Sequence, residues 1–232
     1  APRNPSKNEA YAMVFTSPLP EIEVPDTLLG PFVLQHADRL ANAPALVDGA
    51  SGRSLTYAEF RGALMALAGG LAERGFGKGD VLALMAPNIP EYAVAFHGAA
   101  WVGGSVTTIN PTYTAGEVRH QLNDSGARFL VTASMFLSIA RKAVEGTGVE
   151  AIFTIDESDA PNMTELMGVP LTEQVPAGVN DVVALPYSSG TTGLSKGVML
   201  THRNLIANLV QTAKMLPISE GETVLAFLPF FH

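Results

Sequence analysis

The sequence predicts an α/β fold, in which mostly parallel sheet layers are covered by helices. Short runs of four or five apolar residues recur along the chain, and amphipathic stretches of ten or more residues separate them. Because a strand that is apolar throughout must be covered on both faces, this alternation favours parallel pairing through helical crossovers. Hydrophobic residues make up 47% of the 232, which is enough for a folded core.

The first predicted helix begins at a capping box formed by Thr56 and Glu59. Thr114 and Glu117 form a second capping box, for a helix that ends near Gly126. The apolar residues that follow the first box at helical spacing, until Gly75, are Phe60, Leu64, Leu67 and Leu71. The other elements expected in this half are a strand at 81–85, a helix at 91–102, strands at 106–109 and 129–132, a helix at 134–144 and a strand at 151–155.

In the second half of the chain, an irregular segment is expected first, followed by further strands and a helix. Residues 156–180 are acidic and contain Pro and Gly, so we interpret them as a surface connection. A strand at 182–185, a polar loop and a helix at 202–216 with Thr201 as its N-cap follow. A last strand is expected at 224–228.

Composition and charge exclude several classes of partner and site. The 14 Lys and Arg against 22 Asp and Glu leave a net charge of −8, which repels nucleic-acid backbones and anionic lipid. The absence of Cys excludes disulfides, a thiolate nucleophile and Cys-bound zinc, and it fits a cytoplasmic protein. No apolar run is long enough to span a membrane, so we expect no membrane segment. His36, His97, His120 and His202 have no partners at ligand spacing, so we expect no metal site.

A loop rich in glycine and hydroxyl side chains, YSSGTTGLSKG at 187–197, follows the predicted strand at 182–185. Its glycines permit positive φ and can turn backbone N–H groups toward one point, as in an anion-binding nest. Its Ser and Thr hydroxyls add short donors, and Lys196 adds a positive charge. These residues therefore indicate a loop that binds a polyphosphate. The plain alternative is a flexible polar linker in which Lys196 is solvated.

Two common nucleotide-binding fingerprints do not fit the sequence. A Walker A loop needs Gly directly before Lys and a hydroxyl directly after it, whereas Lys196 stands between Ser195 and Gly197. The dinucleotide fingerprint follows a strand, whereas its nearest counterpart here precedes one, with glycines at 75, 77 and 79. A P-loop phosphotransferase is therefore disfavoured.

The order of residues within the loop is specific. PYSSGTTGLSKGVMLTHRNL at 186–205 resembles the phosphate-binding signature of the adenylate-forming (AMP-binding) enzymes, and FLPFFH at 227–232 resembles the start of their next signature. SLTYAEF at 54–60 and GDVLALMAPNIPEY at 79–92 are also similar to that family. The phrasing resembles most closely that of 4-coumarate:CoA ligases and fatty-acyl-CoA synthetases. Ser195 departs from it, because many relatives have Pro before the Lys.

This resemblance implies how the chain is organised. Residues 26–232 would form an incomplete N-terminal AMP-binding domain, preceded by a lead-in segment at 1–25 and carrying the phosphate loop at 187–197. Family members are much longer, and their magnesium and ribose signatures, hinge and C-terminal domain have no match here. The chain is therefore identified as an N-terminal fragment, with the C-terminal domain absent, and we expect it to be inactive alone.

The resemblance also implies a reaction. The family uses ATP to convert a carboxylic acid into an acyl-adenylate and then forms a thioester with coenzyme A, so it is an acid–thiol ligase. Mg²⁺ assists, with ligands mostly outside this chain. Carried over by position, Thr191 and Lys196 would be catalytic, and His232 would border the acid. The residues that would bind the ATP phosphates are Ser188, Ser189, Gly190, Thr191, Thr192, Gly193 and Lys196.

A non-catalytic nucleotide-binding or interaction module is the main alternative. His232 follows two Phe at the end of the sequence, where packing is the plain interpretation. Trp101 and Tyr92 are interpreted as core residues, and His202 as a residue that merely opens its helix. Aromatic, cinnamate-like acids and fatty acids both stay open as substrates, so fatty acid metabolism is one expected setting, and no oligomeric state is predicted.

Overall fold

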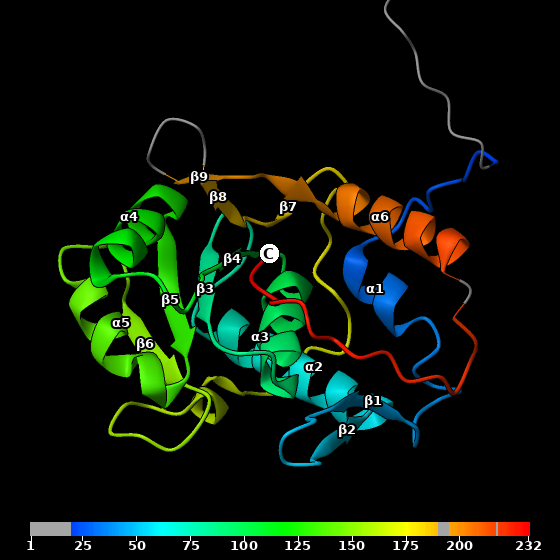
Figure 1. Ribbon diagram of the computed structural model, residues 1–232, viewed down its shortest axis with the longest axis horizontal. Coiled ribbons are helices and arrows are strands. Elements are labelled where there is room, and N and C mark those ends of the chain that lie inside the picture. Colours follow the sequence, from blue (N-terminus) through cyan, green and yellow to red (C-terminus); the bar gives the residue numbers. More distant parts are fainter. Residues whose placement is uncertain (1–19, 190–194, 217) are drawn as a thin grey trace, which may run out of the picture.

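The computed structural model describes residues 20–189, 195–216 and 218–232. Its centre is a six-stranded sheet with the strand order β10-β7-β4-β3-β5-β6 (Figure 1). Neighbouring strands from β7 to β6 are parallel, and β10 runs antiparallel to β7. The strands are β3 Val81–Met85, β4 Ser105–Thr108, β5 Ala127–Thr132, β6 Ala151–Thr154, β7 Val182–Ala184 and β10 Leu200–Thr201. The predicted α/β class is confirmed.

Helices cover both faces of this sheet, α2 and α3 on one side and α4 and α5 on the other (Figure 1). Their bounds are α2 Tyr57–Glu73, α3 Pro90–Trp101, α4 Ala115–Ser125 and α5 Leu137–Val144. Leu82 and Leu84 of β3 pack in the cluster formed with α2 and α3. Val81, Ala83 and Met85 pack in the cluster formed with α4 and α5. Every residue of β3 is buried, as predicted for a central parallel strand.

Helix ends follow the capping signals in the sequence. The boxes at Thr56 and Thr114 both form. In each, the Thr hydroxyl accepts from the backbone N–H three residues later, and the carboxylate of the Glu at that position accepts from the backbone N–H of the Thr. Thr201 forms a third box with Asn204. Helix α4 ends at Gly126, whose φ of 65° favours glycine. The predicted helix at 134–144 is divided into the 3₁₀ turn η1 and α5, with η1 spanning Ser134–Phe136.

Several elements were not predicted. They are the helix α1 Leu29–Leu34, the hairpin of β1 Pro44–Val47 and β2 Ser54–Thr56, the 3₁₀ helix η2 Met163–Leu166, the hairpin of β8 Tyr187–Ser189 and β9 Ser195–Gly197, and the short strand β10. The helix expected at 202–216 is present as α6 His202–Met215. Within the described residues, no helix is long and apolar enough to cross a membrane.

The interpretation of His202 as a residue that merely opens α6 is wrong. Its ring is almost fully buried, and its Nδ1 accepts a hydrogen bond of 3.2 Å from the backbone N–H of Leu29, the first residue of α1. Burial lowers the pKa of His202, and the nearby charge of Asp181 opposes that change. This side chain therefore joins two helices that are far apart in the sequence.

Residues 156–180 are more than the predicted surface connection, because part of them seals the core. Met163 and Leu166 are buried. The backbone at Leu166 lies directly against α2 at Gly70, where a Cβ would meet the Leu166 carbonyl oxygen at 1.7 Å. Trp101, a core residue as predicted, donates its indole N–H to the carbonyl of Leu171 at 2.8 Å. Contacts made by bare backbone leave no apolar pattern, so the sequence does not indicate them.

The strand expected at 224–228 does not form. Val224, Leu225, Phe227 and Leu228 are largely exposed. Asn88 donates its side-chain amide to the carbonyls of Ala226 and Leu228, at 2.9 and 2.7 Å. The backbone of this segment therefore finds partners on one side chain and not on a neighbouring strand, so its apolar composition misled the prediction.

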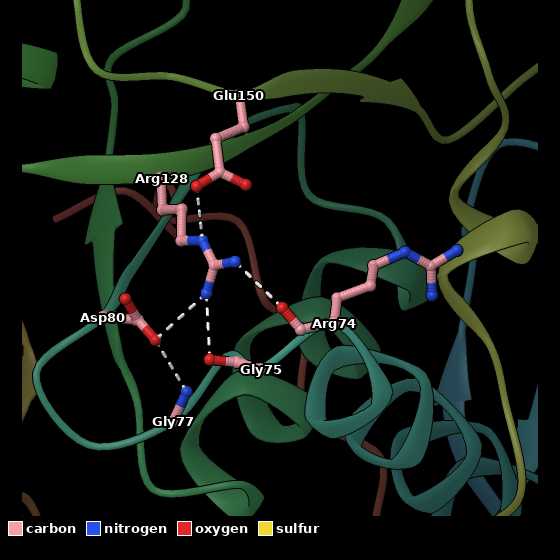
Figure 2. Close-up of polar contacts among 6 residues, drawn as sticks. All are labelled: Arg74, Gly75, Gly77, Asp80, Arg128 and Glu150. Atoms are coloured by element: carbon pink, nitrogen blue, oxygen red, sulfur yellow. Dashed lines mark hydrogen bonds and ion pairs between the residues drawn. The ribbon is translucent and has the colours of Figure 1, made fainter.

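Arg128 closes the end of the sheet at which the parallel strands begin (Figure 2). Its guanidinium donates to the carbonyls of Arg74 and Gly75, just beyond α2, at 2.9 Å each. The same group pairs with Glu150 at 2.8 Å and with Asp80 at 3.4 Å. One side chain thus joins the end of α2 to the starts of β3, β5 and β6.

Candidate functional site

The chain order places a topological switch point between β3 and β4. The connection from β3 to β4 runs through α3 on one face, whereas the connection from β4 to β5 runs through α4 on the other. In open α/β sheets, ligands bind outside the carboxyl ends of the strands at such a point. The carboxyl ends of β3 and β4 are therefore the place to search for a site.

The C-terminal segment of the chain returns to this switch point, where the end labelled C lies close to β3 and β4 (Figure 1). Asn88, just after β3, accepts a hydrogen bond from the N–H of Phe230 at 2.9 Å. Thr108, the last residue of β4, donates its hydroxyl to the carbonyl of Phe231 at 2.8 Å. Tyr92 donates to the carbonyl of Phe230 at 3.2 Å, and its ring is buried as predicted. His232 is therefore held at the carboxyl ends of the strands.

The polar loop leaves the sheet at the same end, from β7, which lies beside β4. Thr107 of β4 donates to the carbonyl of Leu185 at 2.9 Å. Gln121 of α4 donates to the Thr107 hydroxyl at 2.9 Å and to the Thr108 carbonyl at 3.0 Å. These buried contacts fix the position at which the chain enters β8.

The predicted phosphate-binding residues are described in part. Ser188 pairs with Lys196 across the hairpin of β8 and β9, and both residues are exposed. Ser189 ends β8. Gly190, Thr191, Thr192 and Gly193 lie outside the described residues. The structure thus brings Ser188 and Lys196 together at the carboxyl edge of the sheet, and the convergence of donors expected from the loop stays a prediction.

The base of this hairpin contacts α4. Tyr187 is buried, and its hydroxyl donates to a carboxylate oxygen of Asp124 at 2.6 Å. Burial raises the pKa of the Tyr187 hydroxyl, as do its bond to Asp124 and the charge of that carboxylate, so the group stays protonated. His120 Nε2 lies 3.2 Å from the carbonyl oxygen of Ser195 on the other strand. The sequence analysis missed Asp124 and His120, because polar residues on a helix surface usually face water.

An apolar pocket of about 620 Å³ lies between α3 and the C-terminal segment. Phe96 and His97 line it from α3, and Phe227 and His232 line it from the segment. His97 Nδ1 is buried and has no hydrogen-bond partner among the described residues. Burial lowers the pKa of His97 to about 4, so the ring is neutral at pH 7. A mainly apolar lining suits an apolar group.

Comparison with known proteins identifies the family. The family described as AMP-binding enzyme matches residues 33–232. This chain belongs to that family. The predicted resemblance is therefore confirmed, and the AMP-binding match includes both the loop at 187–197 and His232.

Two curated relatives of this AMP-binding chain are 4-coumarate:CoA ligases. 4-Coumarate–CoA ligase 3 of Oryza sativa subsp. japonica is 40% identical over 229 residues, which cover 95% of this chain and 41% of that protein. 4-Coumarate–CoA ligase 1 of Narcissus pseudonarcissus is 38% identical over 240 residues, which cover 98% of this chain and 43% of that protein. The chain therefore spans about two fifths of the length of these relatives.

Two solved structures have the same fold. A long-chain-fatty-acid-CoA ligase of Archaeoglobus fulgidus aligns with a TM-score of 0.85 at 29% identity, covering 94% of this chain and 45% of that one. O-Succinylbenzoate coenzyme A synthetase of Bacillus subtilis, solved in complex with AMP, aligns with a TM-score of 0.70 at 29% identity, covering 87% and 50%. The α/β architecture described above is thus that of acyl-CoA ligases.

Proposed function

We propose that this chain is the ATP-binding part of an AMP-forming acid–thiol ligase. In that reaction ATP activates a carboxylic acid to an acyl-adenylate, and coenzyme A then forms the thioester. One observation supports this proposal most strongly: the β8–β9 hairpin and the segment that ends at His232 both lie at the carboxyl ends of the strands of one sheet. The chain that contains them matches the AMP-binding family. Residues 26–232 would be part of the N-terminal domain, residues 1–25 its lead-in, and the C-terminal domain would lie outside this chain.

The proposed roles follow from the charges that must meet. A carboxylate attacks the α-phosphorus of ATP and pyrophosphate leaves, so two anions have to approach each other. Thr191 and Lys196 would neutralise and orient the departing phosphates, and His232 would border the acid. The residues proposed to bind the β- and γ-phosphates are Ser188, Ser189, Gly190, Thr191, Thr192, Gly193 and Lys196.

In this proposal Mg²⁺ would bind together with ATP and would offset negative charge on its phosphates. Among the described residues, no group of three or more His, Asp or Glu side chains is arranged to hold a metal ion. The described residues therefore contribute positioning and positive charge, and we propose that metal ligands lie mostly outside the chain.

The acid that the enzyme uses is proposed from its relatives and its pocket. The curated relatives above are 4-coumarate:CoA ligases, and one structural relative is a long-chain-fatty-acid-CoA ligase. The apolar lining beside His232 suits either an aromatic ring or an alkyl chain. We propose an aromatic acid of the cinnamate type first, with fatty acid metabolism as the second setting, and a cytoplasmic location, because the chain lacks Cys.

Pyrophosphate exchange into ATP by the full-length protein tests this function. We expect exchange that requires a carboxylic acid and that falls by about 100-fold or more in Lys196→Ala, because removing one group that stabilises transition-state charge typically costs that much. Lys214→Ala is the matched control, since Lys214 is exposed near the end of α6. Undiminished exchange in Lys196→Ala would overturn the role of that lysine.

Product analysis separates the competing reactions. AMP and pyrophosphate support the ligase, whereas ADP indicates a phosphotransferase. The absence of any acid-dependent exchange, together with retained ATP binding, indicates a non-catalytic binding module. A panel of cinnamate-type and fatty acids, run as the exchange substrate, identifies the acid.

A further inference from the structure

We propose that Asp124 and His120 of α4 are positioning residues that hold the phosphate-loop hairpin, β8 and β9, in place at the edge of the sheet. The contacts themselves do not depend on the function proposed above, but their catalytic consequence rests on it. No part of the family signature quoted above includes either residue.

Helix α4 is fixed on the sheet by several independent contacts. Its N-terminus has a complete capping box and its C-terminus has a left-handed glycine. Val118 and Leu122 are buried in the cluster beneath it. Gln121 donates two buried hydrogen bonds to β4. The helix is therefore a firm support for whatever contacts its outer side.

His120 and Asp124 are four residues apart, so they lie on one side of α4. Each contacts a different strand of the hairpin. Asp124 accepts the hydroxyl of Tyr187 at the start of β8, at 2.6 Å. His120 Nε2 lies 3.2 Å from the carbonyl oxygen of Ser195 at the start of β9, and because a carbonyl can only accept, the imidazole N–H is the donor. The hairpin is thus held on both strands.

The hairpin itself is organised around the Tyr187 ring. Tyr187 pairs with Gly197 across the two strands. A Cβ at Gly197 would lie 3.1 Å from the Tyr187 ring, so the ring packs closely against that glycine. The phenol of Tyr187 therefore contacts Asp124 from a fixed position. Gly197 allows this because it has no side chain to push the ring away.

Such a support is needed because two strands alone are only marginally stable in water. Ser188 and Lys196, which we propose as phosphate ligands, are each adjacent to a residue that α4 holds. Their distance from the switch point is therefore set by α4. Catalysis that depends on positioning loses rate when such groups shift by an ångström.

Trypsin cleavage after Lys196 tests the contacts without any nucleotide. In the full-length protein, we expect Tyr187→Phe and Asp124→Ala to be cleaved there several-fold faster than the wild type, because local opening becomes easier. The double variant should be cleaved no faster than the faster single variant, since both lose the same bond. Asp124→Asn keeps an acceptor and should restore slow cleavage.

Asn123→Ala is the matched control, because Asn123 is the exposed neighbour of Asp124 on α4. Thermal unfolding of each variant identifies any loss of global stability. Tyr187→Phe retains the ring, so it decides the matter if Asp124→Ala fails to fold. Wild-type cleavage rates in Tyr187→Phe, or additive effects in the double variant, overturn the proposed contacts.

Kinetics test the consequence for catalysis. In Tyr187→Phe and Asp124→Ala we expect the KM for ATP to rise about tenfold or more, with the KM for the acid unchanged, because only the phosphate ligands shift. Faster cleavage with an unchanged KM for ATP overturns the positioning role. A wild type that shows no acid-dependent exchange refutes the proposed function, and the cleavage results then still decide whether α4 holds the hairpin.

Discussion

At the start of the parallel strands, Arg128 joins α2, β3, β5 and β6 through carbonyls and carboxylates. At the carboxyl ends of β3 and β4, uncharged side chains hold a segment that comes much later in the chain. Asn88 and Thr108, which hold residues near His232, are examples of the second kind. Charged pairs lock the first end. Among the described residues, the contacts at the switch point come from Asn88, Tyr92 and Thr108, which are uncharged. A carboxylate, that of Asp124, contacts the neighbouring hairpin, where it accepts from Tyr187. We infer that the first end serves stability and that the second holds the candidate site.

The largest expected loss of stability comes from a substitution in α2, near the first end of the sheet. Gly70→Ala places a Cβ 1.7 Å from the carbonyl oxygen of Leu166, so the segment that covers α2 has to move. We expect the free energy of unfolding to fall by more than about 3 kcal/mol, as for severe overpacking. Gly62→Ala on the same helix has open space at its Cβ and should raise the free energy of unfolding by up to about 1 kcal/mol. Urea denaturation measures both; equal effects would contradict the close approach.

A pH titration sharpens the comparison by isolating one buried neutral group. Because the pKa of His97 is lowered to about 4 in the folded chain, the unfolded chain binds more protons below pH 6.5. The free energy of unfolding should therefore fall between pH 6.5 and 4, by at most about 3 kcal/mol from this residue.

His97→Leu should lack that part of the pH dependence. Carboxylates whose pKa values are lowered, such as Asp156, contribute equally to the free energy of unfolding of both proteins. Subtracting one curve of unfolding free energy against pH from the other therefore leaves the contribution of His97. Parallel curves for the two proteins would show that folding does not lower the pKa of His97.

Arg128→Leu tests the first end more gently. It leaves two carbonyls and two carboxylates without their donor, so we expect the free energy of unfolding to fall by about 1–3 kcal/mol. Arg128→Lys should recover only part of it, because an ammonium cannot reproduce the planar fork of donors. The KM for ATP should not change in either variant. A change would contradict the inference that the end of the sheet held by Arg128 affects stability and not the site.

The smallest effect on stability is expected at the second end. Asn88→Ala removes three hydrogen bonds to an exposed segment, so the free energy of unfolding should fall by about 1 kcal/mol or less. Hydrogen exchange at the Phe230 amide should become much faster, since that amide loses its acceptor. Slow exchange in the variant would mean that Asn88 does not hold the segment.

Local signals in the sequence predicted most of the sheet and its four covering helices. Capping boxes at Thr56 and Thr114 and the apolar run at β3 act over a few residues, and each is confirmed. The contact of the β8–β9 hairpin with α4, the packing of Leu166 on Gly70 and the burial of His202 were missed, because each depends on partners distant in sequence. The run at 224–228 failed for the same reason, since apolar composition does not provide a neighbouring strand.

One part of the candidate site has a sequence motif, and another part depends on geometry that the sequence does not indicate. The order of residues from 187 to 197 identified the loop, and the AMP-binding match is consistent with it. Asp124 and His120 carry no such signal, because their partners Tyr187 and Ser195 are more than 60 residues away. Asn88 lies within a segment quoted for its likeness to the family, but its bond to Phe230 spans 142 residues.

That span has a kinetic consequence. A contact between residues 142 positions apart requires closure of a very large loop, and such contacts form slowly and late. During synthesis, the units from β3 to β6 can assemble while the ribosome is still adding the residues that follow them. The contacts at the switch point are completed only after Phe230 has emerged, so the newly made chain forms its scaffold well before it forms the pocket between α3 and the C-terminal segment.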